Sequence, residues 1–321
     1  MRPILLQGHE RSLTQIKYNR EGDLLFSVSK DHVINVWYSH NGERLGTYHG
    51  HNGTVWTVDV NSTTTFLVSG SADNKAKLWD VSNGTCLKSW EFNTAVRAIQ
   101  FSEDDKKILV ITEPRMGFPA TVQIFDVENI DSDPVIFHPE GPKITVAAWG
   151  PLDKHIVVGC ENGSVALMDP KTGKYIMSQK IHEATLMDLQ MSTDRTYFIT
   201  ASKDKSAKIL ETSSLEVLKT YVTDTPLNSA AIFPKIQEFV VVGGGQEAMD
   251  VTRTSSRQGK FECRFWHKIL EEEVGRVRGH FGPINTIAIH PDGRSFASGG
   301  EDGYVRLHHF DEDFFTFRFQ I

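Results

Sequence analysis

The chain has 321 residues, of which 39% are hydrophobic and 23% are charged, and its 34 basic and 41 acidic side chains give a net charge of −7. This composition excludes an intrinsically disordered chain, and it disfavours independent nucleic-acid binding, which requires an excess of basic residues. The apolar runs, such as residues 108–111 and 239–242, are far shorter than the roughly 20 residues of a membrane-spanning helix. We therefore expect a globular protein with no membrane segment.

The cysteines and the start of the chain indicate its compartment. Cys86, Cys160 and Cys263 are odd in number and show no CxxC spacing, so they predict neither a disulfide framework nor a zinc site. Residues 1–9 lack the 7–15-residue apolar core of a secretory signal. Both features predict a cytoplasmic protein.

A repeated frame begins at His9 and recurs along the chain. Counting 28 positions from His9 and from His51 reaches Trp37 and Trp79, and the same spacing separates two further histidines from an apolar or aromatic residue. The copies align on the apolar residues Leu13, Val55, Val96, Ile144, Leu186, Leu227 and Ile284, which places the repeat anchors at residues 9, 51, 92, 140, 182, 223 and 280. This period of about 40–45 residues is typical of β-propeller repeats.

Each copy contains four short strand patterns. In the first copy they cover residues 13–18, 24–29, 33–38 and 44–48, separated by turn residues such as Asn41 and Gly42. Four antiparallel strands per unit, with a Gly-His to Trp-Asp frame, are typical of a WD40 blade. The sequence therefore predicts an all-β fold, a single seven-bladed WD40 β-propeller that spans residues 1–321.

Two terminal segments compete to close the ring, because the last blade would otherwise expose an unpaired strand edge. Residues 4–7 precede the first Gly-His, at the register of an outer strand. Residues 314–319 alternate three phenylalanines on one face of a possible strand. The sequence does not decide between them.

Four copies share a histidine, a serine or threonine, and an aspartate at fixed spacing. Together with two tryptophans, the set is His9, Ser27, Asp31, Trp37, His51, Ser69, Asp73, Trp79, His182, Thr200, Asp204, His280, Ser298 and Asp302. These residue types could form a catalytic triad, but an active site needs one such arrangement and not four at the same register. We therefore interpret the set as a structural hydrogen-bond network, and we expect no enzyme activity. The copies anchored at 92, 140 and 223 lack the histidine and should depend more on apolar packing.

Other motifs predict neither a cofactor nor a metal. Residues 243–246 lack the lysine and the helix of a phosphate loop. The pairs His49/His51 and His308/His309 have no third ligand at suitable spacing. The acidic run 271–273 fits a solvated hairpin tip.

Insertions mark one face of the predicted disc. The third copy gains about five residues near 112–119, and the sixth gains about fifteen between 245 and 260, in both cases between the second and third strands. These connections lie on the face of the Gly-His loops. The polar segment that contains Arg253 and Arg257 is either a contact loop or only a flexible connection.

The junction of the fifth and sixth copies is a candidate partner site. Thr223 and Asp224 replace the expected Gly-His there, and Asp204 lies in the adjacent turn. The two carboxylates could present negative charge to a basic helix that lies across blades 5 and 6. The alternative is a solvated acidic turn.

Whole segments also resemble a known family, namely MRPILLQGHERSLTQIKYNREGDLLFS, VVVGGGQEAMDVT and GKFECRFWHKILEEEVGRVRGHFGPINT. They are similar to the i subunit of eukaryotic translation initiation factor 3. The resemblance implies a non-enzymatic scaffold that binds the C-terminal helical segment of subunit b and also subunit g. It also implies support for loading of the small ribosomal subunit and for mRNA scanning. A signalling adaptor, or a propeller that reads a peptide or small ligand at its channel, is the alternative.

Overall fold

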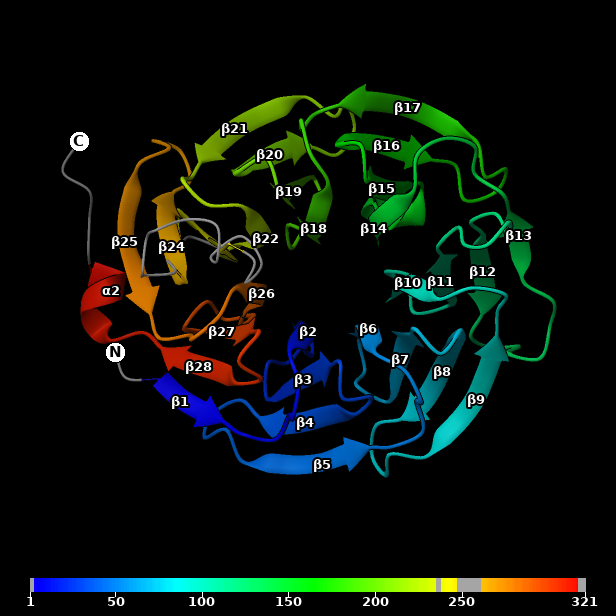
Figure 1. Ribbon diagram of the computed structural model, residues 1–321, viewed down its shortest axis with the longest axis horizontal. Helices are drawn as coiled ribbons and strands as arrows, with labels where there is room; N and C mark the ends of the chain where they lie inside the picture. Colours follow the sequence, from blue (N-terminus) through cyan, green and yellow to red (C-terminus); the bar gives the residue numbers. More distant parts are fainter. Residues whose placement is uncertain (1–2, 235–237, 247–260, 317–321) are drawn as a thin grey trace.

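Seven four-stranded antiparallel sheets surround a central axis like the blades of a propeller (Figure 1). The structure is a computed structural model that describes residues 3–234, 238–246 and 261–316. Six sheets contain four strands consecutive in the sequence, ordered from the axis outward. The predicted all-β, seven-bladed propeller is therefore confirmed.

The strand bounds agree closely with the repeat. Blades 1 to 4 contain β2 (Leu13–Tyr18), β3 (Leu24–Ser29), β4 (Ile34–Tyr38) and β5 (Arg44–Tyr48); β6 (Val55–Val60), β7 (Phe66–Ser71), β8 (Lys75–Asp80) and β9 (Cys86–Glu91); β10 (Val96–Phe101), β11 (Lys107–Thr112), β12 (Val122–Asp126) and β13 (Val135–Phe137); β14 (Ile144–Trp149), β15 (Ile156–Cys160), β16 (Ser164–Met168) and β17 (Tyr175–Lys180). Blades 5 to 7 contain β18 (Leu186–Met191), β19 (Tyr197–Ser202), β20 (Ser206–Glu211) and β21 (Val217–Val222); β22 (Leu227–Ile232), β23 (Phe239–Gly244), β24 (Glu262–His267) and β25 (Glu273–Arg278); β26 (Ile284–Ile289), β27 (Ser295–Gly300), β28 (Val305–His309) and β1 (Pro3–Leu6). The described helices are the short η1 (Pro151–Asp153) and α2 (Glu312–Thr316). The seven apolar residues that align the repeats are the first residues of the seven inner strands.

The hydrophobic core lies between neighbouring sheets. All six residues of β3 are buried, whereas five of the six residues of β17 are exposed. Apolar clusters join one blade to the next, as where Trp37 of blade 1 packs with Leu307 of blade 7. A strand buried on both faces reads as a continuous apolar run, which explains the pattern of the middle strands.

The N-terminal strand closes the ring. β1 pairs antiparallel with β28, with Ile4 opposite Leu307, and it lies beside β28 in Figure 1. The competing C-terminal segment instead begins as α2, where the Phe314 ring stacks on Phe310 with centroids 4.1 Å apart. Residues 317–319 of that segment lie outside the described residues. The first of the two predicted closures is therefore correct.

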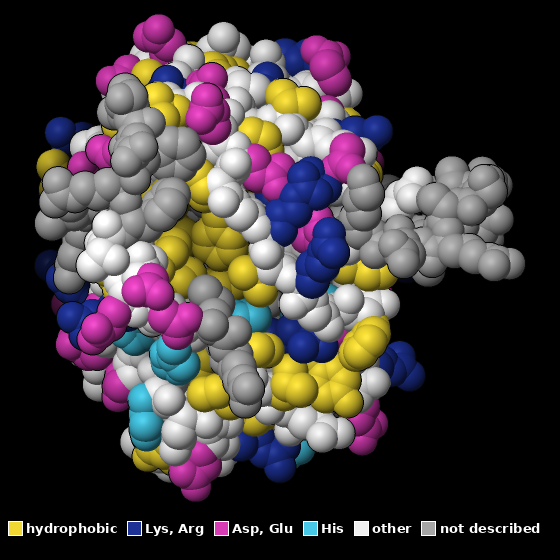
Figure 2. All heavy atoms as spheres, turned by 90° about the vertical axis from the view of Figure 1, so that its left-hand side faces the viewer, with side chains coloured by type: hydrophobic (Ala, Val, Ile, Leu, Met, Phe, Trp, Pro, Cys, Tyr) yellow, Lys and Arg dark blue, Asp and Glu magenta, His cyan; other side chains and the backbone are white. Residues whose placement is uncertain are grey.

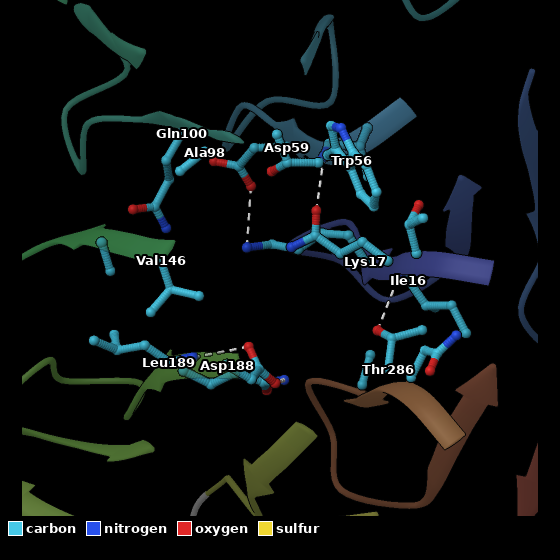
Figure 3. A pocket seen from close by; sticks show the side chains of 18 of the residues that line it. Ile16, Lys17, Trp56, Asp59, Ala98, Gln100, Val146, Asp188, Leu189 and Thr286 are labelled. Carbon is cyan, nitrogen blue, oxygen red and sulfur yellow. Dashed lines mark hydrogen bonds and ion pairs between the residues drawn. The ribbon is translucent and has the colours of Figure 1, made fainter. Parts of the chain in front are cut away.

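The seven inner strands line a central cavity, and side chains link each of these strands to the inner strands of the neighbouring blades (Figure 3). The Ile16 amide of β2 donates to Thr286 Oγ1 of β26 at 3.0 Å, and the Val58 amide of β6 donates to Gln15 Oε1 of β2 at 2.7 Å. The remaining links are Phe101 N to Asp59 Oδ2, Trp149 N to Gln100 Oε1, Thr145 Oγ1 to the Leu186 carbonyl, Ala230 N to Asp188 Oδ2, and Ile287 N to Ser229 Oγ. Each inner strand is thus hydrogen-bonded to both of its neighbours.

Ring closure by β1 can be tested with two leucines of the same strand. Leu6 is 2% exposed and belongs to the core between blades 7 and 1, whereas Leu5 is 53% exposed on the opposite face. We expect Leu6→Ala to lower the free energy of unfolding by about 2–4 kcal/mol because it leaves a cavity. Leu5→Ala should change it by less than about 0.5 kcal/mol. Equal effects of the two substitutions in urea denaturation would contradict closure by β1.

Candidate partner-binding surface

The predicted histidine network is present in blade 1. His9 Nδ1 lies 2.9 Å from Asp31 Oδ2, and His9 Nε2 lies 2.8 Å from Ser27 Oγ. The Trp37 indole N–H donates to the same Ser27 oxygen at 2.8 Å. Since the ionised Asp31 carboxylate can only accept, the imidazole donates to it through Nδ1. Nε2 of the neutral imidazole is then an acceptor, and the Ser27 hydroxyl donates to it while accepting the indole N–H.

Blade 2 repeats this geometry with His51, Asp73, Ser69 and Trp79. The hydrogen-bond directions are those of a Ser-His-Asp triad, but Ser27, Ser69 and Ser298 are each 0% exposed. A hydroxyl without access to solvent cannot attack a substrate. The geometry therefore supports a structural role, joining the loop before the inner strand to the turn between the second and third strands.

The network also sets the ionisation of its aspartates. Burial alone would raise the pKa of Asp31, but the hydrogen bond and charge of His9 and the Glu10 amide lower it to about 2. The pKa of Asp73 is lowered to about 2 by the corresponding groups, again against the effect of burial. Both aspartates are therefore ionised acceptors at neutral pH.

Blades 5 and 7 keep the histidine but lack the tryptophan. His182 lies 2.8 Å from both Asp204 Oδ2 and Thr200 Oγ1, and Leu210 occupies the tryptophan position. In blade 7, His280 contacts Ser298 and Asp302, and His308 takes the tryptophan position and stacks on Phe296 with centroids 4.6 Å apart. His308 Nδ1 is buried with no hydrogen-bond partner among the described residues.

Blades 3 and 6 illustrate what replaces the network where the histidine is missing. Phe92 stands at the histidine position of blade 3 and packs edge-on against Phe125, with ring centroids 6.3 Å apart. In blade 6, Val242 stands where other blades have serine or threonine, and the buried Trp266 indole nitrogen has no partner in the described part of the chain. In blade 3 an apolar contact thus stands in place of the network, as predicted, whereas blade 6 leaves the Trp266 indole nitrogen unsatisfied among the described residues.

At the junction of blades 5 and 6, the carboxylates are less available than the sequence suggested. Asp204 is 13% exposed and accepts hydrogen bonds from His182, the Ser206 hydroxyl and the Glu183 amide. Thr223 is buried, and its hydroxyl lies within hydrogen-bond distance of the Lys205 and Thr225 carbonyls. The expectation that Asp204 and Asp224 jointly present negative charge is therefore corrected, because the Asp204 carboxylate is occupied within its own blade.

Asp224 itself has a partner that the sequence analysis missed. Its carboxylate accepts a hydrogen bond from the guanidinium of Arg264 on β24, a side chain only 5% exposed. Asp224 is 47% exposed and so remains at the surface. The loop that replaces Gly-His is thus held by an ion pair in place of a histidine.

The repeat contained the signal for Arg264. Arg264 stands two positions before the tryptophan position, where other blades also have polar side chains. Asn35 donates to the Gly8 carbonyl at 3.1 Å, and Lys208 donates to the Ile181 carbonyl at 2.7 Å. This position therefore reaches the loop before its own blade's inner strand, and comparing the copies would have predicted that Arg264 reaches Asp224.

Other charges near the junction are also paired. Glu262 is 5% exposed and accepts hydrogen bonds from Arg276 at 3.1 Å and from Arg278 at 2.6 Å. Glu271, at the predicted hairpin tip, accepts from the Thr220 amide of blade 5. Basic and acidic side chains lie interspersed on the rim of blades 6 and 7 (Figure 2). The candidate residues Arg253 and Arg257 lie outside the described residues.

Two further features are absent from the described ranges, a membrane-spanning helix and a cluster of metal-ligating side chains. No helix there is long and apolar enough to cross a bilayer. No cluster of three or more histidine, cysteine, aspartate or glutamate side chains there is arranged to hold a metal ion.

A closed ring of seven antiparallel sheets, with a histidine network that joins loop to turn, defines a WD40-type β-propeller. The EIF3I family model matches residues 1–320. The chain belongs to the family of eukaryotic translation initiation factor 3 subunit I.

Relatives named "Eukaryotic translation initiation factor 3 subunit I" are similar over the whole chain. The Botryotinia fuckeliana protein is 58% identical, with 100% of this chain and 98% of the relative covered. The Neurospora crassa protein is 58% identical, with coverage of 100% and 95%. The Schizosaccharomyces pombe protein is 57% identical, with 100% of both chains covered.

Removal of one network histidine should affect stability and not recognition. His51→Ala leaves the buried Asp73 carboxylate without its main partner, so we expect the free energy of unfolding to fall by about 1–3 kcal/mol. His49→Ala is the control, because His49 is an exposed neighbour in the same loop. An unchanged denaturation midpoint for His51→Ala, combined with loss of partner binding, would make the network a functional site.

The buried His308 predicts that the folded protein loses stability at acidic pH. Burial, with the charges of His280 and Arg306, lowers its pKa to about 4. Between pH 6.5 and 4 the unfolded chain therefore binds a proton that the folded chain does not, so stability falls as the pH falls through this window. We expect His308→Phe, which keeps the stack on Phe296, to remove about 2–3 kcal/mol of that loss. Parallel curves of unfolding free energy against pH for parent and variant would contradict this assignment.

Proposed function

We propose that this chain is the non-enzymatic scaffold subunit i of the eukaryotic translation initiation factor 3 complex and acts in the cytoplasm. The observation that carries this proposal is the 58% identity, over the full length of the chain, to relatives of that name. The fold supports it, since a ring closed by hydrogen bonds between all neighbouring inner strands is a rigid platform. The buried network hydroxyls give no support to a catalytic role.

In this proposal the partners are subunits b and g, and the ring contacts the small ribosomal subunit only through the complex. The C-terminal helical segment of subunit b lies across blades 5 and 6. Asp224 supports this placement because its half-exposed carboxylate is fixed by Arg264 at the surface of that junction. A fixed carboxylate can accept charge-assisted hydrogen bonds from a basic helix without losing side-chain entropy on binding. The bound complex would support loading of the small ribosomal subunit and mRNA scanning.

A signalling adaptor, or a peptide- or ligand-reading propeller outside translation, is the second candidate. The observation that favours it is an open central cavity of about 1560 Å³ with polar side chains in its wall. Mass spectrometry of partners retained after gentle affinity purification distinguishes the two. Initiation factor subunits should dominate for the first candidate, and signalling proteins for the second.

The subunit-b site can be tested by neutralising Asp224. A charge at the rim of an interface acts mainly on association and on its salt dependence. We therefore expect Asp224→Asn to weaken binding of a peptide with the subunit-b C-terminal sequence by about three- to tenfold at low salt, and by less at physiological salt. Titration calorimetry gives both affinities.

Asp133→Asn is the matched control, because Asp133 is an exposed aspartate of blade 3, far around the ring. It should leave both the affinity and the melting temperature unchanged. Asp224→Asn should melt lower than the parent, because the Arg264 guanidinium, only 5% exposed, loses its charged partner, so all affinities are measured at a temperature at which both variants are fully folded. Parent-like affinity of Asp224→Asn at both salt concentrations would remove Asp224 from the site and turn attention to residues 245–260. A parent protein that does not bind the peptide would instead contradict the partner itself.

A further inference from the structure

The central cavity is lined by the seven inner strands and extends from the loops that precede them, such as that of Phe281, to the turns that follow them, such as that of Arg20. Lys17, Asp59, Gln100 and Asp188 project from its wall, with Trp56 at one side (Figure 3). Most of these polar groups already have partners within the ring. Lys17 pairs with Asp59 at 3.1 Å, and Gln100 and Asp188 accept backbone amides of neighbouring strands.

The second residue of each inner strand stands at the mouth of this cavity, next to the loops. In chain order these residues are Thr14, Trp56, Arg97, Thr145, Met187, Asn228 and Asn285. Arg97 is the charged member of this set. A cation at this one copy is not required by the repeat, because the other copies fold without it.

Arg97 is held in place but lacks an acceptor. Its guanidinium lies over the Trp56 ring, 4.8 Å from the centroid. No hydrogen bond or ion pair of the Arg97 side chain occurs within residues 3–234, 238–246 and 261–316. The nearby Glu113 carboxylate accepts a hydrogen bond from Lys143 at 2.6 Å. A partly buried guanidinium on an aromatic platform, with its donors unused, is preorganised to bind a planar or tetrahedral anion.

The surroundings limit the kind of anion. The net charge of −7 and the pairing of Lys17 disfavour a long polyanion such as RNA, which needs many free cations. Phe281, in the loop before β26, lines the same cavity and is 83% exposed. Phe281 belongs to blade 7 and Arg97 to blade 3, so the two side chains line different parts of the same cavity. An extended peptide with one anionic side chain can contact both parts, whereas a free anion can contact only one.

We propose that Arg97, supported by Trp56, binds a single carboxylate or phosphate group carried by a short peptide segment that enters the mouth of the central cavity. This site is separate from Asp224 and does not depend on the proposed subunit contacts. Its ligand has the opposite charge to a helix that would bind Asp224.

The test uses five-residue blocked alanine peptides with a central phosphoserine, glutamate or serine, and inorganic phosphate as a fourth probe. The full chain, labelled with ¹⁵N at arginine, is titrated and the Arg97 Nε–H signal is followed. We expect saturable shifts with the phosphoserine and glutamate peptides, with dissociation constants of about 0.1–5 mM, and none with the serine peptide. Equal affinity for inorganic phosphate and the phosphoserine peptide would overturn the assignment to a peptide.

Variants locate the site. Because the Arg97 variants lack the Arg97 Nε–H, parent and variants are compared by ¹⁵N labelling at tryptophan and the Trp56 indole N–H signal, since the Trp56 ring lies 4.8 Å from the Arg97 guanidinium. Arg97→Gln should weaken phosphoserine-peptide binding at least about tenfold, and Arg97→Lys, which keeps the charge but loses the planar fork, by about threefold. Arg20→Gln is the control, because Arg20 is an exposed arginine that follows β2 at the opposite end of the cavity. Parent-like binding by Arg97→Gln, or equal loss in Arg20→Gln, would overturn the proposal, and so would the absence of any shift in the parent at about 10 mM peptide.

Discussion

The ring depends on one constraint, which is that the backbone amides along the inner edge of every blade need hydrogen-bond partners. An edge strand exposes unpaired amides, and in a propeller these edges meet around one cavity. Side chains solve the problem here, as when Asp59 of β6 accepts the Phe101 amide of β10 at 2.9 Å. Because each such bond joins two blades, loss of one blade would leave polar atoms unsatisfied in both neighbours. Blade spacing is therefore fixed by hydrogen bonds as well as by apolar packing.

The histidine network adds a second set of links within blades, and its gaps show how a repeat tolerates change. Blades 1 and 2 satisfy every member of the set, whereas blade 6 leaves the Trp266 indole nitrogen without a partner among the described residues. Its loop is instead held by the ion pair of Arg264 and Asp224. Three of the seven copies lack the histidine, and the ring tolerates this because hydrogen bonds between neighbouring inner strands still hold every blade, although a buried unsatisfied donor costs about 1–3 kcal/mol.

Most of the fold could be predicted from the sequence because the same pattern of strands and turns recurs in seven copies, so that each copy supports the assignment made in the others. Leu13 and Ile284 begin inner strands because the same apolar residue recurs at the same offset from each anchor. Closure was ambiguous, since residues 4–7 and 314–319 both have strand-like patterns. The choice depends on Phe314, which stacks on Phe310, four residues before it, and lies near Phe233, which is 81 positions away in the sequence and in no local strand pattern with it. The missed pair of Arg264 and Asp224 spans 40 residues and becomes visible only when one repeat position is compared across blades.

Recognition must therefore reside where the copies differ, because residues that the frame shares are already engaged with one another. On the loop face two such differences stand out, the Asp224 loop between blades 5 and 6 and Arg97 in blade 3. Each holds a charge beside a fixed neighbour, Arg264 in one case and Trp56 in the other. The negative Asp224 favours a basic ligand and the positive Arg97 favours an anionic one. Each ligand would meet a like charge at the other's site, so neither should bind there. A single rigid face can thus hold a basic helix at its rim and an anionic side chain at its centre without either ligand displacing the other.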